Sequence, residues 1–240
     1  MARISRVLAV CTFLLVSSSN AAAVGLIVAS GDSTPMATAG TPDNNVFFSN
    51  VLGVGTSVVV HEAPNDFLGT SLSNFYGSLT GVSSAYVNIG EITASMLSGV
   101  DLFVSSLFGG ALSAGEVSLL NTFVDGGGSL MFMGEYTNTF AGINSALAEL
   151  GSAMRLIGEP DEPAGSYSAI VLSDPLTSGV SSFTYGYGYG VSGGTSIFKE
   201  SISNRVFMAY ENVNGVSEPG AFALLGLGLA ALAAARRRKQ

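Results

Sequence analysis

The sequence predicts an α/β fold, a three-layer sandwich in which a mostly parallel sheet carries an antiparallel extension. Between residues 24 and 154, apolar runs of strand length alternate with helix-like stretches, joined by short connections. That order is typical of a parallel sheet with helices on both faces. After Met154, short β-like pieces follow one another to residue 210. We interpret these pieces as the last parallel strand and an antiparallel extension.

The body begins with a strand, a helix and a second strand. These elements are expected at residues 24–28, 42–52 and 57–60, and a short helix is expected around residues 72–79. Pro42 and Asp43 favour the first turn of a helix, and Gly53 ends it. The second strand is predicted by its run of three valines, since β-branched side chains favour strands.

A strand–helix–strand–helix unit is the clearest part of the sequence. Its elements are expected at residues 100–105, 113–125, 129–133 and 139–150. Ser113, with Glu116 three residues later, forms a capping box, which marks the start of a helix. Gly126–Gly128 ends this helix, and Gly151 ends the next one. The short connections in this unit support the parallel sheet.

Short β-like pieces make up the rest of the body. They lie at residues 168–172, 183–191, 196–198 and 206–210, with an ordered turn at 174–180. In the second piece, Tyr185, Tyr187 and Tyr189 alternate with glycines. Alternate side chains of a strand share a face, so the three tyrosines form a stripe. We expect this stripe either to stack on sugars or to pack under a loop or an edge hairpin.

The first 23 residues have the order of a secretory signal peptide. Two arginines precede an apolar run at residues 7–16, and small residues end in Ala21–Ala23. The run is too short to span a membrane, which takes about 20 apolar residues; the alternative is a buried first helix or strand. We expect export and cleavage after Ala23. Cleavage removes Cys11, the only cysteine, so the mature protein has no thiol or disulfide.

The other end of the chain has three parts in order. They are a short motif of Val216, Ser217, Glu218 and Pro219, an apolar run at 221–235, and a basic cluster of Arg236, Arg237, Arg238 and Lys239. As a helix, the apolar run spans about 22 Å, less than the ~30 Å hydrocarbon core. A plain tail anchor is one interpretation. The three parts together resemble the PEP-CTERM sorting signal.

That resemblance implies a processing partner. Proteins with such tails are substrates of exosortases, membrane cysteine proteases or transpeptidases of Gram-negative bacteria that make extracellular polysaccharide. The family usually has Val-Pro-Glu-Pro, whereas this chain has Ser217 in the second place, which puts the efficiency of processing in question. We expect a cut near Glu218 and Pro219, after which the body is released or attached to surface material. The basic cluster should stay cytoplasmic, with the body outside.

The chain divides into regions of different charge. We expect a signal peptide at 1–23, a body at 24–212 and a sorting tail at 213–240, and the formal net charge of the whole chain is −8. Residues 24–216 hold three basic and sixteen acidic residues, a formal charge of −13. This balance excludes nucleic-acid binding, which needs a basic face. It also argues against direct electrostatic adhesion to anionic lipid or polysaccharide.

The order of elements in the body resembles the class I glutamine amidotransferase-like (flavodoxin-like) fold. The resemblance rests on the segments Asp101–Val104, Leu120–Leu130 and Asp174–Val180. In catalytic members a nucleophilic cysteine follows the strand after the Gly-Gly pair. Here that strand ends at Met133, and the mature chain has no cysteine. The family's cysteine–histidine pair has no counterpart, so the resemblance implies the fold without the amidotransferase chemistry.

Few residues remain as candidates for chemistry. Asp32 follows the first strand, and Glu135 and Tyr136 follow a central strand. Because open α/β sheets bind ligands at the carboxyl ends of strands, we expect these residues in one crevice. Its carboxylates would serve a ligand, an acid–base reaction or a calcium ion, or would only cap helices and face solvent. The only histidine, His61, lies at a strand end beside Glu62, and a lone histidine is more often structural than catalytic.

The sequence therefore predicts an exported protein that is not an enzyme and binds no cofactor or metal. Its expected partners are the export machinery with signal peptidase, an exosortase-like membrane transpeptidase and an extracellular polysaccharide. We expect an inner-membrane tether with the body in the periplasm, and then transfer to the cell surface or biofilm matrix. The alternative is an exported hydrolase that uses the carboxylates of Asp32 and Glu135.

Overall fold

A computed structural model of the protein describes residues 24–62, 68–106, 112–134, 137–159, 163 and 165–214. The predicted signal peptide lies outside these residues, as does the predicted sorting tail from residue 215 onward, with its membrane segment at 221–235. Within the described ranges, no helix combines the length and the apolar character needed to cross a membrane.

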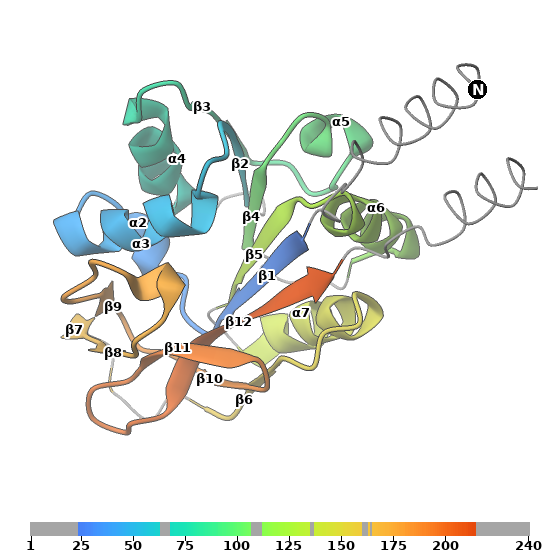
Figure 1. Ribbon diagram of the computed structural model, residues 1–240. Helices are drawn as coiled ribbons and strands as arrows, with labels where there is room; N and C mark the ends of the chain where they lie inside the picture. The colour runs from blue at the N-terminus through green and yellow to red at the C-terminus, as the bar shows by residue number, and fades with distance from the viewer. Residues whose placement is uncertain are drawn as a thin grey trace, which may run out of the picture. The chain divides into compact units, whose positions relative to one another are not determined.

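Five strands form the parallel part of the sheet, in the order β3-β2-β4-β5-β1 (Figure 1). They are β1 (Val24–Ser30), β2 (Ser57–Glu62), β3 (Ser83–Val87), β4 (Leu102–Ser106) and β5 (Ser129–Met133). The helices between and after them are α2 (Thr34–Ala37), α3 (Pro42–Leu52), α4 (Gly69–Ser78), α5 (Ala94–Leu97), α6 (Ala114–Asp125) and α7 (Thr137–Glu149).

Antiparallel strands continue the same sheet beyond β1. β12 (Val206–Asn214) pairs with β1, β11 (Thr195–Lys199) pairs with β12, and β8 (Ile170–Val171) pairs with β11. Two short antiparallel pairs lie outside this sheet. They are β6 (Arg155–Ile157) with β10 (Gly190–Ser192), and β7 (Tyr167–Ser168) with β9 (Thr184–Tyr185).

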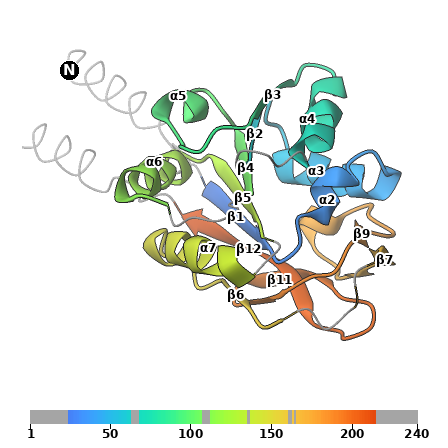
Figure 2. The ribbon, with the colours of Figure 1, turned by 180° about the vertical axis from the view of Figure 1, so that it is seen from behind.

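Helices cover both faces of the parallel strands (Figure 2). On one face, Phe47 of α3 and Leu72 of α4 belong to a hydrophobic cluster with residues of the strands. On the other face, Leu120 of α6 and Ile143 of α7 belong to a second cluster. The chain steps one way across the sheet from β1 to β3 and steps back from β3 to β5. Because β–helix–β crossovers are right-handed, this reversal moves the helices to the opposite face.

The α/β fold with a mostly parallel sheet and an antiparallel extension is confirmed. The strand order departs from the flavodoxin-like expectation at one strand, and the expectation of a last parallel strand is wrong. A flavodoxin-like sheet has the order 2-1-3-4-5. Here β3-β2-β4-β5 follows that order, but the N-terminal strand β1 takes the fifth place. The described residues after Met154 also contain no parallel strand. A short turn joins β11 to β12, whereas parallel pairing needs a crossover of about a dozen residues.

Local signals were accurate where they were strong. The capping box of α6 is present, since the Ser113 Oγ accepts the Glu116 N–H at 3.3 Å and the Glu116 Oε2 accepts the Ser113 N–H at 2.8 Å. Strand β3 was not predicted, because it is an edge strand of small and half-exposed residues without an apolar run. β12 continues to Asn214, two residues beyond the expected end of the body at residue 212.

Candidate functional site at the carboxyl edge of the sheet

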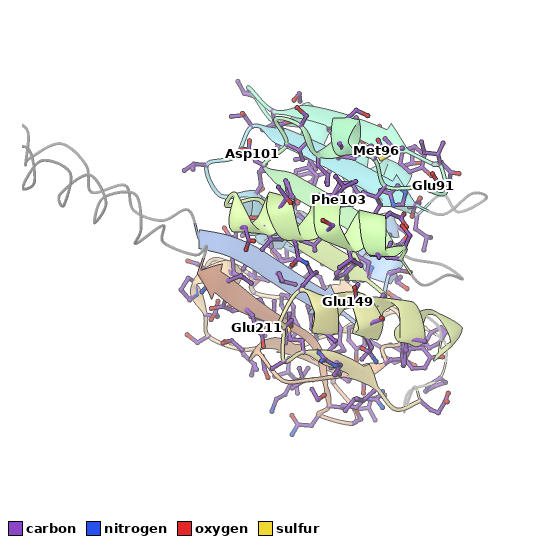
Figure 3. All side chains as sticks on the ribbon, turned by 90° about the vertical axis from the view of Figure 1, so that its right-hand side faces the viewer. Glu91, Met96, Asp101, Phe103, Glu149 and Glu211 are labelled. Carbon is purple, nitrogen blue, oxygen red and sulfur yellow. The ribbon has the colours of Figure 1, made fainter. Side chains whose placement is uncertain are left out.

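The carboxyl ends of the parallel strands meet at one edge of the sheet, which Glu91 marks in Figure 3, opposite Asp101. The polar side chains buried there include those of Ser30, Asp32, His61, Glu62, Ser105 and Ser106. Helix α4 follows β2 on one face, and helix α6 follows the neighbouring strand β4 on the other face. Open α/β sheets bind ligands at such a reversal, so this edge is the candidate site.

His61 lies at the end of β2 and is 2% exposed. Its Nε2 lies 2.7 Å from the Ile89 carbonyl oxygen, which can only accept, so Nε2 carries the proton. The Nδ1 therefore accepts from the Ser105 hydroxyl at 3.1 Å. The imidazole stacks on Phe103, with ring centroids 5.8 Å apart. Burial lowers the pKa of His61, although the Ile89 carbonyl and the charge of Glu116 act in the opposite direction.

These contacts make His61 a neutral, oriented side chain whose two ring nitrogens both have partners. In the pair formed by Ser105 and His61, the Ser105 hydroxyl donates to a histidine nitrogen, which is the arrangement that activates a nucleophilic hydroxyl in enzymes. Ser105 is 0% exposed, however, so a substrate cannot reach its oxygen in this arrangement. The described contacts hold the two side chains in a fixed orientation.

Glu62 is buried on the other face of the same strand end. Its Oε1 accepts the N–H of Gly69, the first residue of α4, at 2.7 Å. Its Oε2 accepts the Tyr86 hydroxyl at 2.8 Å. Burial, together with the charge of Glu62, raises the pKa of Tyr86. A carboxylate at a helix N-terminus is stabilised by the helix dipole, so Glu62 caps α4 from the neighbouring strand.

Asp32 lies just after β1 and is also buried. Its Oδ1 accepts the Thr34 N–H at 2.8 Å, and its Oδ2 accepts the Gly186 N–H at 2.6 Å. The carboxylate therefore fixes the start of α2 and ties it to the turn after β9. β1 and β5 are neighbours, and the Gly134 N–H donates to the Ser30 carbonyl at 2.8 Å. The expected partners of Asp32 in a crevice, Glu135 and Tyr136, lie outside the described residues.

Ser106 differs from the other polar residues of this edge. Its Oγ is buried and has no hydrogen-bond partner among the residues that the structure describes. Ser106 is the register partner of Glu62, so both side chains lie on one face of the sheet. Ser105 and Ser106 were not among the predicted site residues, although two hydroxyls at the end of an apolar strand are a signal that the sequence shows. A bound water or ligand at this edge would give the buried Ser106 hydroxyl a hydrogen-bond partner.

The expected tyrosine stripe is wrong. Residues 183–191 do not form one strand, because β9 ends at Tyr185 and β10 begins at Gly190. Tyr185 is 0% exposed and stacks on Phe207, whereas Tyr189 is 6% exposed and packs edge-on against Phe140 of α7. The two rings belong to the clusters on opposite faces of the sheet. The two-residue period of a strand therefore does not apply, and these rings do not form a surface for sugars.

The described residues contain no group of three histidine, cysteine, aspartate or glutamate side chains that would hold a metal ion. The acidic residues of the carboxyl edge instead accept backbone N–H groups, as Asp32 and Glu62 do.

In the comparisons with known proteins, the strongest functional signal lies at the C-terminus of the chain and not at the carboxyl edge of the sheet. Residues 215–239 match the PEP-CTERM protein-sorting motif. The chain carries a PEP-CTERM sorting tail. Such a tail indicates an exported protein that is anchored by its C-terminus before an exosortase processes it. The residues of the tail lie outside those that the structure describes.

The remaining comparisons concern the body. No curated protein matches this chain. A solved structure described as the mmIFT52 N-terminal domain superposes with a TM-score of 0.47 and 15% sequence identity, over 66% of this chain and 86% of that one. The resemblance of the body to the glutamine amidotransferase-like fold finds no support in these comparisons.

Proposed function

We propose that this protein is an exported, non-catalytic component of the cell surface or extracellular matrix of a polysaccharide-producing Gram-negative bacterium. An exosortase-like transpeptidase cuts its tail near Glu218 and Pro219, and the body is then released or attached at that location. The observation that carries the proposal is the PEP-CTERM motif at residues 215–239.

The contacts at the carboxyl edge support a body without catalysis. Asp32 and Glu62 each accept a backbone N–H that starts a helix, and both nitrogens of His61 have partners. A general base or nucleophile needs a free lone pair within reach of a substrate. No described contact favours the alternative function, a hydrolase that uses the carboxylates of Asp32 and Glu135.

The proposal gives the chain a route through the cell envelope. Signal peptidase cuts after Ala23, and the apolar run at 221–235 holds the body at the periplasmic side of the inner membrane. The basic cluster at 236–239 stays in the cytoplasm, because positive residues resist translocation. Processing near Glu218 then releases the body toward the surface, where an extracellular polysaccharide is the proposed neighbour.

The proposal also treats the body as a degenerate relative of the class I glutamine amidotransferase-like fold. The strand order β3-β2-β4-β5 and the Gly-Gly pair before β5 support this relationship. The catalytic cysteine of that family has no counterpart, because the chain's cysteine is Cys11 in the signal peptide. We therefore assign no amidotransferase activity to the body.

Mass spectrometry of the mature C-terminus tests the proposal. In the native host, we expect the body to end near Glu218, and we expect the full tail to persist in a strain without the exosortase. Glu218→Ala should block processing. Ser217→Pro, which restores the second position of the family motif, should be cut at least as fast as the natural sequence. Recovery of an intact basic cluster from the surface fraction would falsify the sorting function.

A further inference from the structure

The two ends of the body lie side by side at the amino edge of the sheet. β12 pairs antiparallel with β1, and Asn214 is the register partner of Val24. Glu218 follows Asn214 by four residues in the sequence. Four residues of extended chain reach at most about 14 Å. An enzyme that cuts the tail near Glu218 must therefore come close to this edge of the folded body.

The amino edge is made by loops that hydrogen bonds hold together. These loops span residues 53–56, 79–82, 98–101 and 126–128. The Ser83 N–H donates to the Thr56 carbonyl at 2.8 Å, and the Ser129 N–H donates to the Asp101 carbonyl at 2.8 Å. The Asp101 Oδ2 also accepts the N–H groups of Thr56 at 2.6 Å and Ser57 at 3.0 Å. Because the loops are already fixed, a partner that binds them orders little new structure.

The side chains of the loops at this edge are mostly small and uncharged. Val54, at the tip of the first loop, is fully exposed at 101%. Helices α5 and α6 border a groove of about 360 Å³, whose lining includes Leu97, Val100 and Phe123. Helix α6 packs directly on β1, since a Cβ at Gly25 would lie 2.4 Å from the Val124 carbonyl oxygen. Helix α6 therefore contacts both the groove and the strand at which the chain enters the body.

We propose that this amino edge, with Val54 and the groove between α5 and α6, is the surface that meets the membrane-embedded processing enzyme while it cuts the tail. This inference rests on the proposed sorting function and adds the face of the body that the enzyme contacts. The short reach from Asn214 brings the two proteins together, and the small loops allow the close approach.

The composition of the edge favours a protein partner over lipid headgroups. The four loops contain no lysine or arginine, and two exposed acidic residues lie at this edge, Asp101 in the third loop and Asp125 just before the fourth. Anionic membrane surfaces attract basic segments, so an edge with only acidic charges gains nothing from them. A protein surface accommodates both an exposed valine and an apolar groove.

Photo-crosslinking in the full chain tests the contact directly. A benzophenone side chain at position 54, introduced while the host's exosortase is present, should form an adduct that contains the exosortase. The matched control is position 202, because Ile202 is also an exposed apolar residue, at 67%, in the turn between β11 and β12. Adducts with lipid alone from position 54, or equal exosortase adducts from both positions, would overturn the inference.

Processing rates give an independent measurement. Val54→Arg should slow cleavage by about tenfold, because it places an unpaired charge in the contact, whereas Ile202→Arg should not. About twelve Gly/Ser residues inserted after Gly215 add up to about 40 Å of reach and should remove the difference between Val54→Arg and the natural residue. Equal rates without the insert, or a Val54→Arg defect that persists with it, would contradict the contact.

These outcomes separate the inference from the sorting function on which it rests. If the natural chain is never cut, the sorting function fails. If the natural chain is cut and the edge variants behave as it does, only the contact surface fails.

Discussion

Replacing Tyr185 distinguishes a core residue from a surface residue. The ring is 0% exposed and stacks on Phe207 at a centroid distance of 4.6 Å. Its hydroxyl accepts the Ser201 N–H at 2.8 Å. Truncating a buried aromatic ring to alanine costs about 3–5 kcal/mol, a large part of the 5–15 kcal/mol that typically stabilises a domain. We expect Tyr185→Ala to lower the melting temperature by about 6–20 °C, at 2–4 °C per kcal/mol.

Two further variants calibrate this measurement. Tyr185→Phe keeps the ring and removes the hydroxyl, which leaves the Ser201 N–H without its partner and should cost about 1–3 kcal/mol. Tyr187→Ala changes a half-buried side chain outside any strand and should cost less than either change at Tyr185. Urea denaturation followed by circular dichroism gives all three free energies. If Tyr185→Ala stays within about 0.5 kcal/mol of the natural protein, the ring is not part of the core.

Three other predictions concern single side chains. Burial lowers the pKa of His61 below its ordinary 6.5, so the unfolded chain binds the proton more tightly than the folded chain. The contribution of His61 to the free energy of unfolding is therefore full above about pH 6.5. It falls as the pH drops, by up to about 1.4 kcal/mol per pH unit. His61→Gln should remove that part of the slope in urea titrations at pH 5 and 7, and an unchanged slope would contradict the assignment. Ser113→Ala should cost about 1 kcal/mol by loss of the capping box, measured by calorimetry, with Ser118→Ala in the same helix as the neutral control. Gly134→Ala places a Cβ 2.5 Å from a leucine of β6 and should cost about 1–3 kcal/mol in urea, whereas Gly90→Ala meets nothing within 4 Å and should have little effect.

The sequence predicted those parts of the fold whose signals are local. The capping box at Ser113 and Glu116 marked the start of α6, and the apolar run at 129–133 coincides with β5. The sorting tail was also predicted from its own residues, because its motif, apolar run and basic cluster are contiguous, and residues 215–239 match the PEP-CTERM motif. Each of these features is recognised from a contiguous segment, whatever the conformation of the rest of the chain.

The candidate site was predicted only in part. Asp32 and His61 lie at strand ends, as expected from the apolar runs before them. Their contacts could not be predicted, because the Gly186 N–H that Asp32 accepts lies 154 residues away in sequence and the Ser105 partner of His61 lies 44 residues away. A pattern of single residues carries no information about which distant donor will meet a given carboxylate.

The sequence by itself determined the alternation of strands and helices, the acidic and cysteine-free body, and the sorting tail. Only the tertiary structure decided that β1 lies between β5 and β12, and that Tyr185 and Tyr189 point into opposite cores. The physical reason is that helix and strand periods, caps and turns act within a few residues, whereas strand order depends on which apolar faces the whole chain can bury together. That pairing of the first and last strands is also what brings both ends of the body to one edge.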